Sequence, residues 1–222
     1  MTGVKICGLT APGQVEAAAR AGAAYVGFVF FARSPRNLAA DHAAGLALQV
    51  PAGICKVALT VDADDAMLEA LLAAVPLDML QLHGRESPER VAQVRARFGL
   101  PVMKALGIAS AEDVAGVARY EDAADMLLLD AKAPAGAALP GGNGLAFDWR
   151  LLAGKRFSRP WMLAGGLTPE TVARAVTLTG APNVDVSSGV ESAPGVKDAR
   201  KVADFVAAAR TASGGEPAPC LR

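Results

Sequence analysis

Leu163-Ala164-Gly165-Gly166-Leu167-Thr168-Pro169-Glu170 is one of two similar stretches that decide the fold, and Val184-Asp185-Val186-Ser187-Ser188-Gly189-Val190-Glu191 is the other. Each begins as a short apolar run, turns at glycine, and leads at once or after a short loop into a helical pattern. Glycine lets the backbone approach a bound group closely, and backbone N–H groups ahead of a helix suit an anion. Two consecutive turns of this kind predict the phosphate site that follows strands seven and eight of a (β/α)8 barrel. For either stretch alone, an ordinary strand-to-helix turn is an equal alternative.

Short apolar runs alternate with helical stretches along the rest of the chain. The pattern predicts strands near residues 3–7, 24–30, 54–60, 78–83, 101–106, 125–130, 160–164 and 183–187. Helices fill the intervals: the sixth is short, around Phe147 to Leu152, the seventh begins at Thr168-Pro169-Glu170, and the eighth runs near 196–211. We therefore predict an α/β fold with a single (β/α)8 TIM barrel over residues 1–211. A doubly wound open sheet is the alternative, and the Gly-, Pro- and Ala-rich tail 212–222 is expected to be disordered.

Composition excludes several classes of partner. The formal charge of +0 and the pI of about 6.7 offer no electrostatic basis for binding nucleic acid or an anionic membrane. Apolar stretches are interrupted before they reach membrane-spanning length, and the first residues lead directly into a strand, so we expect no signal peptide. Cys7, Cys55 and Cys220 form no disulfide or zinc spacing, which favours a reducing cytoplasm and a site without metal.

Side chains alternate along a strand, so parity predicts which of them enter the barrel. The inward set comprises Lys5, Cys7, Met79, Gln81, His83, Met126, Leu128 and Asp130. Because active sites of this fold lie at the carboxyl ends of the strands, Cys7, His83 and Asp130 should converge on one mouth. Strands one and eight are neighbours in a closed barrel, so Lys5 and Asp185 should pair inside it in a structural role.

Several segments, in order along nearly the whole chain, together resemble one known family. They are Val4-Lys5-Ile6-Cys7-Gly8-Leu9-Thr10, Gln81-Leu82-His83-Gly84, Leu129-Asp130, Gly141-Gly142-Asn143-Gly144 with Phe147-Asp148-Trp149, Leu163 to Pro169, and Asp185 to Lys197. The family is phosphoribosylanthranilate isomerase of tryptophan biosynthesis. Two segments depart from it: strand three lacks a phenylalanine-bearing form, and Asn143-Gly144-Leu145-Ala146 replaces a more usual lysine-bearing turn.

The resemblance implies a (β/α)8 barrel that performs an Amadori rearrangement without metal or cofactor. N-(5-phosphoribosyl)anthranilate becomes 1-(2-carboxyphenylamino)-1-deoxyribulose 5-phosphate, a small-molecule reaction that leaves the oligomeric state open between monomer and homodimer. Asp130 is the expected general acid that protonates the furanose ring oxygen, and Cys7 the expected general base that removes the C2 proton. Only a thiolate can act as that base, so some feature of the site must favour ionisation of Cys7. The alternatives are that Asp130 caps a loop or pairs with Lys132, and that Cys7 is a buried structural cysteine.

The resemblance also implies how the substrate binds. Arg36 matches the arginine that holds the anthranilate carboxylate, with Arg33 as the solvated alternative. His83 lines the anthranilate side or serves as a structural histidine. Gly165, Gly166, Ser187, Ser188 and Gly189 are the expected phosphate-binding residues. The glycine-rich run 140–144 is either a lid or an ordinary flexible connection.

Other classes of function compete with this interpretation. Indole-3-glycerol phosphate synthase and the sugar isomerase of histidine biosynthesis are related phosphate-binding barrels, but the latter uses two aspartates, whereas strand one here ends in Cys7. A phosphate-ligand sensor would need neither Cys7 nor Asp130. A thiol redox protein is disfavoured because no second cysteine lies near the first.

Overall fold

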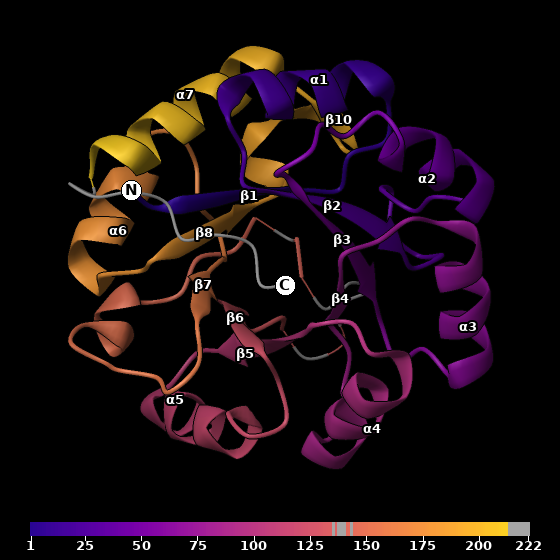
Figure 1. The fold of residues 1–222 in the computed structure, drawn as a ribbon. Helices are drawn as coiled ribbons and strands as arrows, with labels where there is room; N and C mark the ends of the chain where they lie inside the picture. The colour runs from indigo at the N-terminus through magenta and orange to yellow at the C-terminus, as the bar shows by residue number, and fades with distance from the viewer. Residues whose placement is uncertain (135, 137–140, 143, 213–222) are drawn as a thin grey trace.

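Eight parallel strands form a closed barrel in sequential order, with the first strand hydrogen-bonded to the eighth. The computed structural model describes residues 1–134, 136, 141–142 and 144–212. Figure 1 looks along the barrel, with the strands in a central ring and the helices around it. The strands are β1 (Gly3–Cys7), β2 (Tyr25–Phe30), β3 (Cys55–Thr60), β4 (Met79–Leu82), β5 (Val102–Ile108), β6 (Met126–Ala131), β7 (Trp161–Leu163) and β8 (Asn183–Val186). This closure confirms the predicted TIM barrel and excludes the open sheet.

Helices follow the strands around the barrel. They are α1 (Pro12–Ala21), α2 (Ala40–Ala47), α3 (Asp65–Ala74), α4 (Pro88–Phe98), α5 (Ala111–Gly116), α6 (Val172–Thr179) and α7 (Ala199–Thr211), with the 3-10 helices η1 (Val117–Tyr120), η2 (Trp149–Leu152) and η3 (Ser188–Val190). Capping residues in the local sequence determine where several of these helices begin. For example, the Ser87 side chain accepts a hydrogen bond from the Arg90 backbone N–H at the start of α4, and Pro88 stands in the first turn. Within the described residues, no helix is long and apolar enough to cross a bilayer.

Three predicted helices differ in detail. The sixth is the single 3-10 turn η2. The predicted start at Thr168 was wrong, because residues 168–171 form a turn in which the Thr171 hydroxyl accepts from the Thr168 backbone N–H at 2.9 Å, and α6 begins only at Val172. The predicted start near residue 196 was also wrong, because a hairpin of β9 (Glu191–Ala193) and β10 (Val196–Lys197) precedes α7. The tail 213–222 lies outside the described residues.

The core has two layers, and strand alternation separates them. The layer inside the barrel consists of Tyr25, Cys55, Val57, Met79, Met103, Ala105, Met126, Leu128, Met162 and Ala164. Residues of opposite parity, such as Leu80 and Leu82, pack between the sheet and the helices. This arrangement confirms the predicted inward parity of β4 and β6, because Met79 and Met126 lie in the inner layer.

Lys5 and Asp185 form an ion pair inside the barrel, as the sequence predicts. Their Cα atoms are in register between β1 and β8, and Lys5 Nζ lies 2.9 Å from Asp185 Oδ1. Lys5 is fully buried. Burial alone would lower the pKa of Lys5, but the charge and hydrogen bond of Asp185 outweigh it, so that pKa is raised and the amine stays charged. The pair therefore ties the last strand to the first.

Lys5→Met should destabilise the barrel because it leaves the Asp185 carboxylate buried without its partner. We expect the free energy of unfolding to fall by about 3–5 kcal/mol, as measured by equilibrium urea denaturation. Lys5→Met/Asp185→Leu removes both charges and should recover most of that loss. A single variant as stable as the parent protein would show that the pair does not hold the closure.

Candidate active site at the carboxyl ends of the strands

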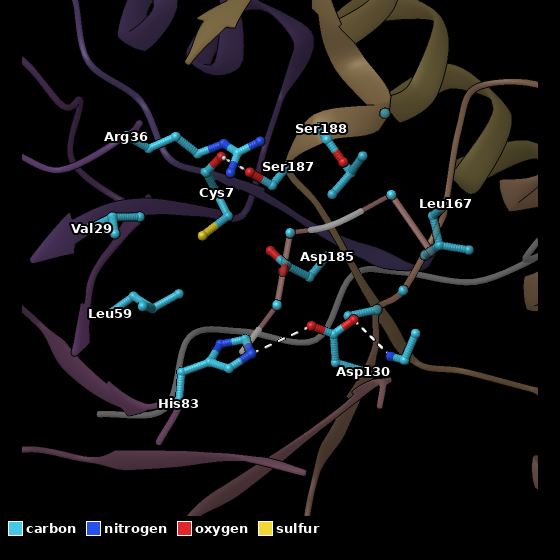
Figure 2. Close-up of a pocket in the computed structure, with 18 of the residues that line it drawn as sticks. Cys7, Val29, Arg36, Leu59, His83, Asp130, Leu167, Asp185, Ser187 and Ser188 are labelled. Carbon is cyan, nitrogen blue, oxygen red and sulfur yellow. Dashed lines mark hydrogen bonds and ion pairs between the residues drawn. The ribbon is translucent and has the colours of Figure 1, made fainter. Parts of the chain in front are cut away.

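One pocket of about 800 Å3, counting the space at its open mouth, lies at the carboxyl ends of the strands. All nine predicted site residues line it: Cys7, Arg36, His83, Asp130, Gly165, Gly166, Ser187, Ser188 and Gly189. Figure 2 shows Cys7, Arg36 and Ser187 together on one side, with His83 and Asp130 on another. The structure thus brings the predicted residues into a single cavity.

Cys7 is the last residue of β1, and a glycine on the neighbouring strand makes room for its sulfur. Its Cα partner on β2 is Gly27, where an added Cβ would lie 2.9 Å from Cys7 Sγ and 3.2 Å from Lys5 Nζ. Burial raises the pKa of the Cys7 thiol, and the nearby Lys5 ammonium offsets only part of that rise. In the free protein, Cys7 is therefore held toward its neutral form. Sequence analysis overlooked Gly27, although a glycine inside a strand often marks such a close approach.

Asp130 lies on β6 and is held on both carboxylate oxygens. Oδ1 accepts a hydrogen bond from the Ala131 backbone N–H at 2.8 Å, and Oδ2 lies 3.4 Å from His83 Nε2. Lys132, the predicted alternative partner of Asp130, pairs with Asp113 at 2.6 Å. The carboxyl group is thus directed into the pocket rather than bound to the neighbouring lysine.

His83 follows β4 and faces Asp130. Its Nδ1 lies 2.9 Å from Gln81 Nε2, so with the amide in this orientation Nδ1 accepts and the ring proton resides on Nε2, toward Asp130. A Cβ on Gly141 would lie 2.5 Å from His83 Nε2 and 2.6 Å from Asp130 Oδ2, so the backbone there passes directly over the two side chains. Of the predicted lid, Pro140 and Asn143 lie outside the described residues.

Arg36 is buried in the loop after β2, whereas Arg33 is exposed. The Arg36 guanidinium binds Glu191 with two nitrogens, Nε to Oε1 at 2.7 Å and Nη2 to Oε2 at 2.8 Å. Burial opposes the charged form of Arg36, but the bonds to Glu191 outweigh it and raise its pKa. Arg36 Nη1 lies outside that pair and is 3.0 Å from the position of a Cβ on Gly142, another residue that lines the pocket.

Glu191 and Lys197 lie behind two pocket residues, Arg36 and Ser187, and no role was predicted for either from the sequence. Lys197 Nζ donates to Glu191 Oε1 at 2.6 Å and to the Ser187 backbone oxygen at 3.1 Å. Burial raises the pKa of Glu191, but Arg36 and Lys197 outweigh it and hold that pKa below its ordinary value. Burial also lowers the pKa of Lys197, only partly offset by Glu191. Both residues fall within the Asp185–Lys197 segment that resembles the known family, and this resemblance was the one sequence feature that could have indicated a role for them.

The two glycine turns pack tightly against each other and against Asp130. Gly165 and Gly166 have φ of +87° and +64°, and a Cβ on Gly165 would lie 3.1 Å from Asp130 Oδ1. A Cβ on Gly189 would lie 1.9 Å from the Leu167 backbone oxygen. Only glycine therefore allows this spacing between the turns. In the described part of the chain, no group of three or more His, Cys, Asp or Glu side chains could hold a metal ion.

This chain matches one known protein family over most of its length. A family model described as N-(5'-phosphoribosyl)anthranilate (PRA) isomerase matches residues 4–208 of this chain. The chain belongs to this family. The isomerase is 64% identical over 207 residues to an N-(5'-phosphoribosyl)anthranilate isomerase of Cereibacter sphaeroides, covering 93% of this chain and 98% of the relative.

Solved structures of the family agree with the fold of this isomerase. The crystal structure of phosphoribosyl anthranilate isomerase from Thermotoga maritima has a TM-score of 0.85 at 33% identity, covering 95% of this chain and 100% of that chain. A structure of the isomerase in complex with reduced 1-(o-carboxyphenylamino)-1-deoxyribulose 5-phosphate has a TM-score of 0.83 at 31% identity, with the same coverage. The isomerase therefore acts in tryptophan biosynthesis. Membership of this family excludes the alternative functions considered from the sequence, namely the other barrel enzymes, a phosphate-ligand sensor and a thiol redox protein.

Gly189→Ala should force the two glycine turns of the isomerase apart. Because the added Cβ meets the Leu167 carbonyl rather than a flexible side chain, we expect the affinity for a phosphorylated ligand to fall by about 10- to 100-fold. Isothermal titration calorimetry with the reduced product analogue measures the change. Gly45→Ala is the matched control, because no atom lies within 4 Å of its added Cβ. Equal affinities for the two variants would contradict a phosphate site at these turns.

Proposed function

We propose that this pocket converts N-(5-phosphoribosyl)anthranilate into 1-(2-carboxyphenylamino)-1-deoxyribulose 5-phosphate, with Asp130 as general acid and Cys7 as general base. The observation that carries the assignment is that a carboxyl group and a thiol line one cavity with the two glycine turns. The family member solved in complex with the reduced product supports this ligand class.

Asp130 acts first in the proposed mechanism. Its proton passes to the furanose ring oxygen, the bond from that oxygen to C1 breaks, and the anthranilate nitrogen supplies electrons to form an iminium at C1. Gly165 packs against Asp130, so the turn proposed to hold the phosphate also fixes where the ring oxygen meets the carboxyl group. His83 Nε2 faces the carboxylate that remains and stabilises it.

Cys7 acts second. Its thiolate removes the proton from C2, and the electrons of that C–H bond form the C1–C2 double bond while the iminium nitrogen is neutralised. The resulting enolamine becomes the ketone when the C2 hydroxyl loses its proton and C1 gains one. Because burial raises the pKa of Cys7 in the free protein, a cationic intermediate beside the sulfur is what favours the thiolate.

The remaining pocket residues are proposed to bind the ends of the substrate. The backbone N–H groups of Gly165, Gly166, Ser188 and Gly189 surround the phosphate, while the Ser187 hydroxyl is engaged with the Cys7 backbone oxygen at 3.1 Å. Arg36 binds the anthranilate carboxylate. The apolar side chains of Val29, Leu59 and Val61 line the same pocket and suit the aromatic ring.

The decisive experiment is an assay of fluorescence loss with freshly prepared phosphoribosylanthranilate. Cys7→Ala and Asp130→Asn should each lower kcat by at least about 100-fold, the lower end of the usual contribution of a general acid or base. Affinity for the reduced product analogue should change little, because neither substitution removes a proposed phosphate or carboxylate contact. Full turnover in the Cys7 variant would assign the base to another group. A change confined to KM in the Asp130 variant would contradict its acid role.

The thiol of Cys7 should react slowly with iodoacetamide at neutral pH. Alkylation requires the thiolate, so below the pKa of the thiol the rate should rise about tenfold per pH unit. Since burial raises that pKa, the half-maximal rate should lie above the value of about 8.5 for a free thiol. Mass spectrometry of the Cys7 peptide follows the reaction, and Cys7→Ser is the blank. A midpoint below neutrality would show that the free protein already holds a thiolate.

Two sequence-based predictions remain outside this test. The monomeric or homodimeric state is accessible by sedimentation, and the cytoplasmic location by cell fractionation. Neither alters the proposed chemistry, because every residue in it comes from the barrel of one chain.

A further inference from the structure

The hairpin of β9 and β10 places two charged residues behind Arg36, and the mechanism above uses neither. Glu191 binds Arg36 through both carboxylate oxygens, at 2.7 and 2.8 Å. Lys197 Nζ lies 2.6 Å from Glu191 Oε1. The side chains of Arg36, Glu191 and Lys197 are only 7%, 4% and 1% exposed, so the cluster is shielded from bulk water. Because charges interact more strongly away from water, the geometry and the net charge of this cluster have a large effect on any ion that binds to it.

Glu191 selects which edge of the guanidinium remains available. A guanidinium has five N–H groups in a fixed planar fork. Glu191 takes the edge formed by Nε and Nη2, which leaves the edge formed by Nη1 and the second Nη2 hydrogen. Nη1 is the nitrogen that approaches Gly142 in the pocket wall. The open edge has the geometry for a second carboxylate, bound bidentately.

Lys197 decides the net charge of the cluster. Arg36 and Glu191 alone would be neutral, and Glu191 would repel a second carboxylate bound to the same guanidinium. Burial lowers the pKa of Lys197, but the Glu191 carboxylate 2.6 Å away favours its ammonium form, and with Lys197 protonated the three side chains together carry one net positive charge. Lys197 Nζ also donates to the Ser187 backbone oxygen at 3.1 Å and lies 3.3 Å from Ser187 Oγ. The cluster is thereby joined to the second glycine turn.

We propose that Glu191 and Lys197 are positioning residues for recognition of the substrate carboxylate by Arg36. Glu191 orients the guanidinium so that its open edge faces the pocket, and Lys197 offsets the Glu191 charge so that the cluster still attracts an anion. The proposal rests on the carboxylate-binding role of Arg36 proposed above and deepens it. An Arg36–Glu191 pair serving only to pack the hairpin would need no second cation on the same oxygen.

The test compares two ligands that differ only in the carboxylate. One is reduced 1-(2-carboxyphenylamino)-1-deoxyribulose 5-phosphate, and the other is its phenylamino counterpart. The ratio of their dissociation constants defines carboxylate selectivity, and calorimetry measures both. Glu191→Gln should reduce this selectivity by about 10- to 100-fold, because the amide keeps only one acceptor oxygen and no longer holds the guanidinium with two hydrogen bonds. The substitution also removes a negative charge that repels the ligand carboxylate, so an increase in selectivity would show that charge outweighs orientation and would overturn the orienting role of Glu191. KM should rise more than kcat falls.

Variants of Lys197 separate charge from packing. Lys197→Met should reduce carboxylate selectivity, whereas Lys197→Arg, which keeps the positive charge, should restore most of it. A uniform loss of affinity for both ligands in Lys197→Met would indicate a purely structural contact with Ser187 and would overturn the charge role. Glu86→Gln is the matched control, because Glu86 is also buried and pairs with a lysine, Lys104, at 2.6 Å. Glu86 does not contact Arg36, so the carboxylate selectivity of the Glu86→Gln variant should match that of the parent protein.

Arg36→Met separates failure of this inference from failure of the proposed function. If Arg36→Met leaves carboxylate selectivity unchanged, the proposed role of Arg36 is wrong. If Arg36→Met abolishes it while Glu191→Gln does not alter it, only the positioning role is wrong. Arg36→Met/Glu191→Gln should show the selectivity of Arg36→Met alone, because Glu191 acts through Arg36. If Glu191→Gln folds poorly, Glu191→Asp, which keeps the negative charge on a shorter side chain, tests the orienting role with the same two ligands.

Discussion

The ion pair between Lys5 and Asp185 is the contact on which the rest of the site depends. A buried charge is tolerated only with a partner, so the pair requires β1 and β8 to lie side by side in one register. That closure sets Cys7 beside the second glycine turn, where the Ser187 hydroxyl donates to the Cys7 backbone oxygen at 3.1 Å. Closure of the barrel thus also brings the proposed base next to the proposed phosphate site.

Positive charge dominates the side of the pocket around Cys7. Lys5, Arg36 and Lys197 are balanced by only two carboxylates, Asp185 and Glu191, and all five side chains are mostly buried. Such an excess suits a substrate with a phosphate at one end and a carboxylate at the other. It also opposes the effect of burial on the Cys7 thiol, since both Lys5 and Lys197 act to lower its pKa. The same positive charges therefore favour both the binding of an anionic substrate and the ionisation of the Cys7 thiol.

Much of this arrangement was predictable because it follows from short-range patterns. Strand alternation correctly placed Lys5, Met79 and Met126 inside the barrel, since a strand repeats every two residues. Helix boundaries were less predictable. Thr168 and Pro169 resemble a helix start, but the Thr171 hydroxyl binds the Thr168 backbone N–H and holds a turn there instead. The hairpin before α7 was also missed, because strands of three and two residues carry too little periodicity to detect.

The sequence by itself determined the barrel, the set of inward side chains and the two glycine turns, because each is encoded by residues close together in the chain. Only the tertiary structure decided which charges meet. Arg36 and Glu191 are 155 positions apart, and nothing in their local sequence indicates that they form a bidentate pair. Their contact exists because closure of the barrel brings the loop after β2 against the hairpin after β8. In the folded barrel, His83 is also the neighbour of Asp130, whereas Lys132 forms its ion pair with Asp113.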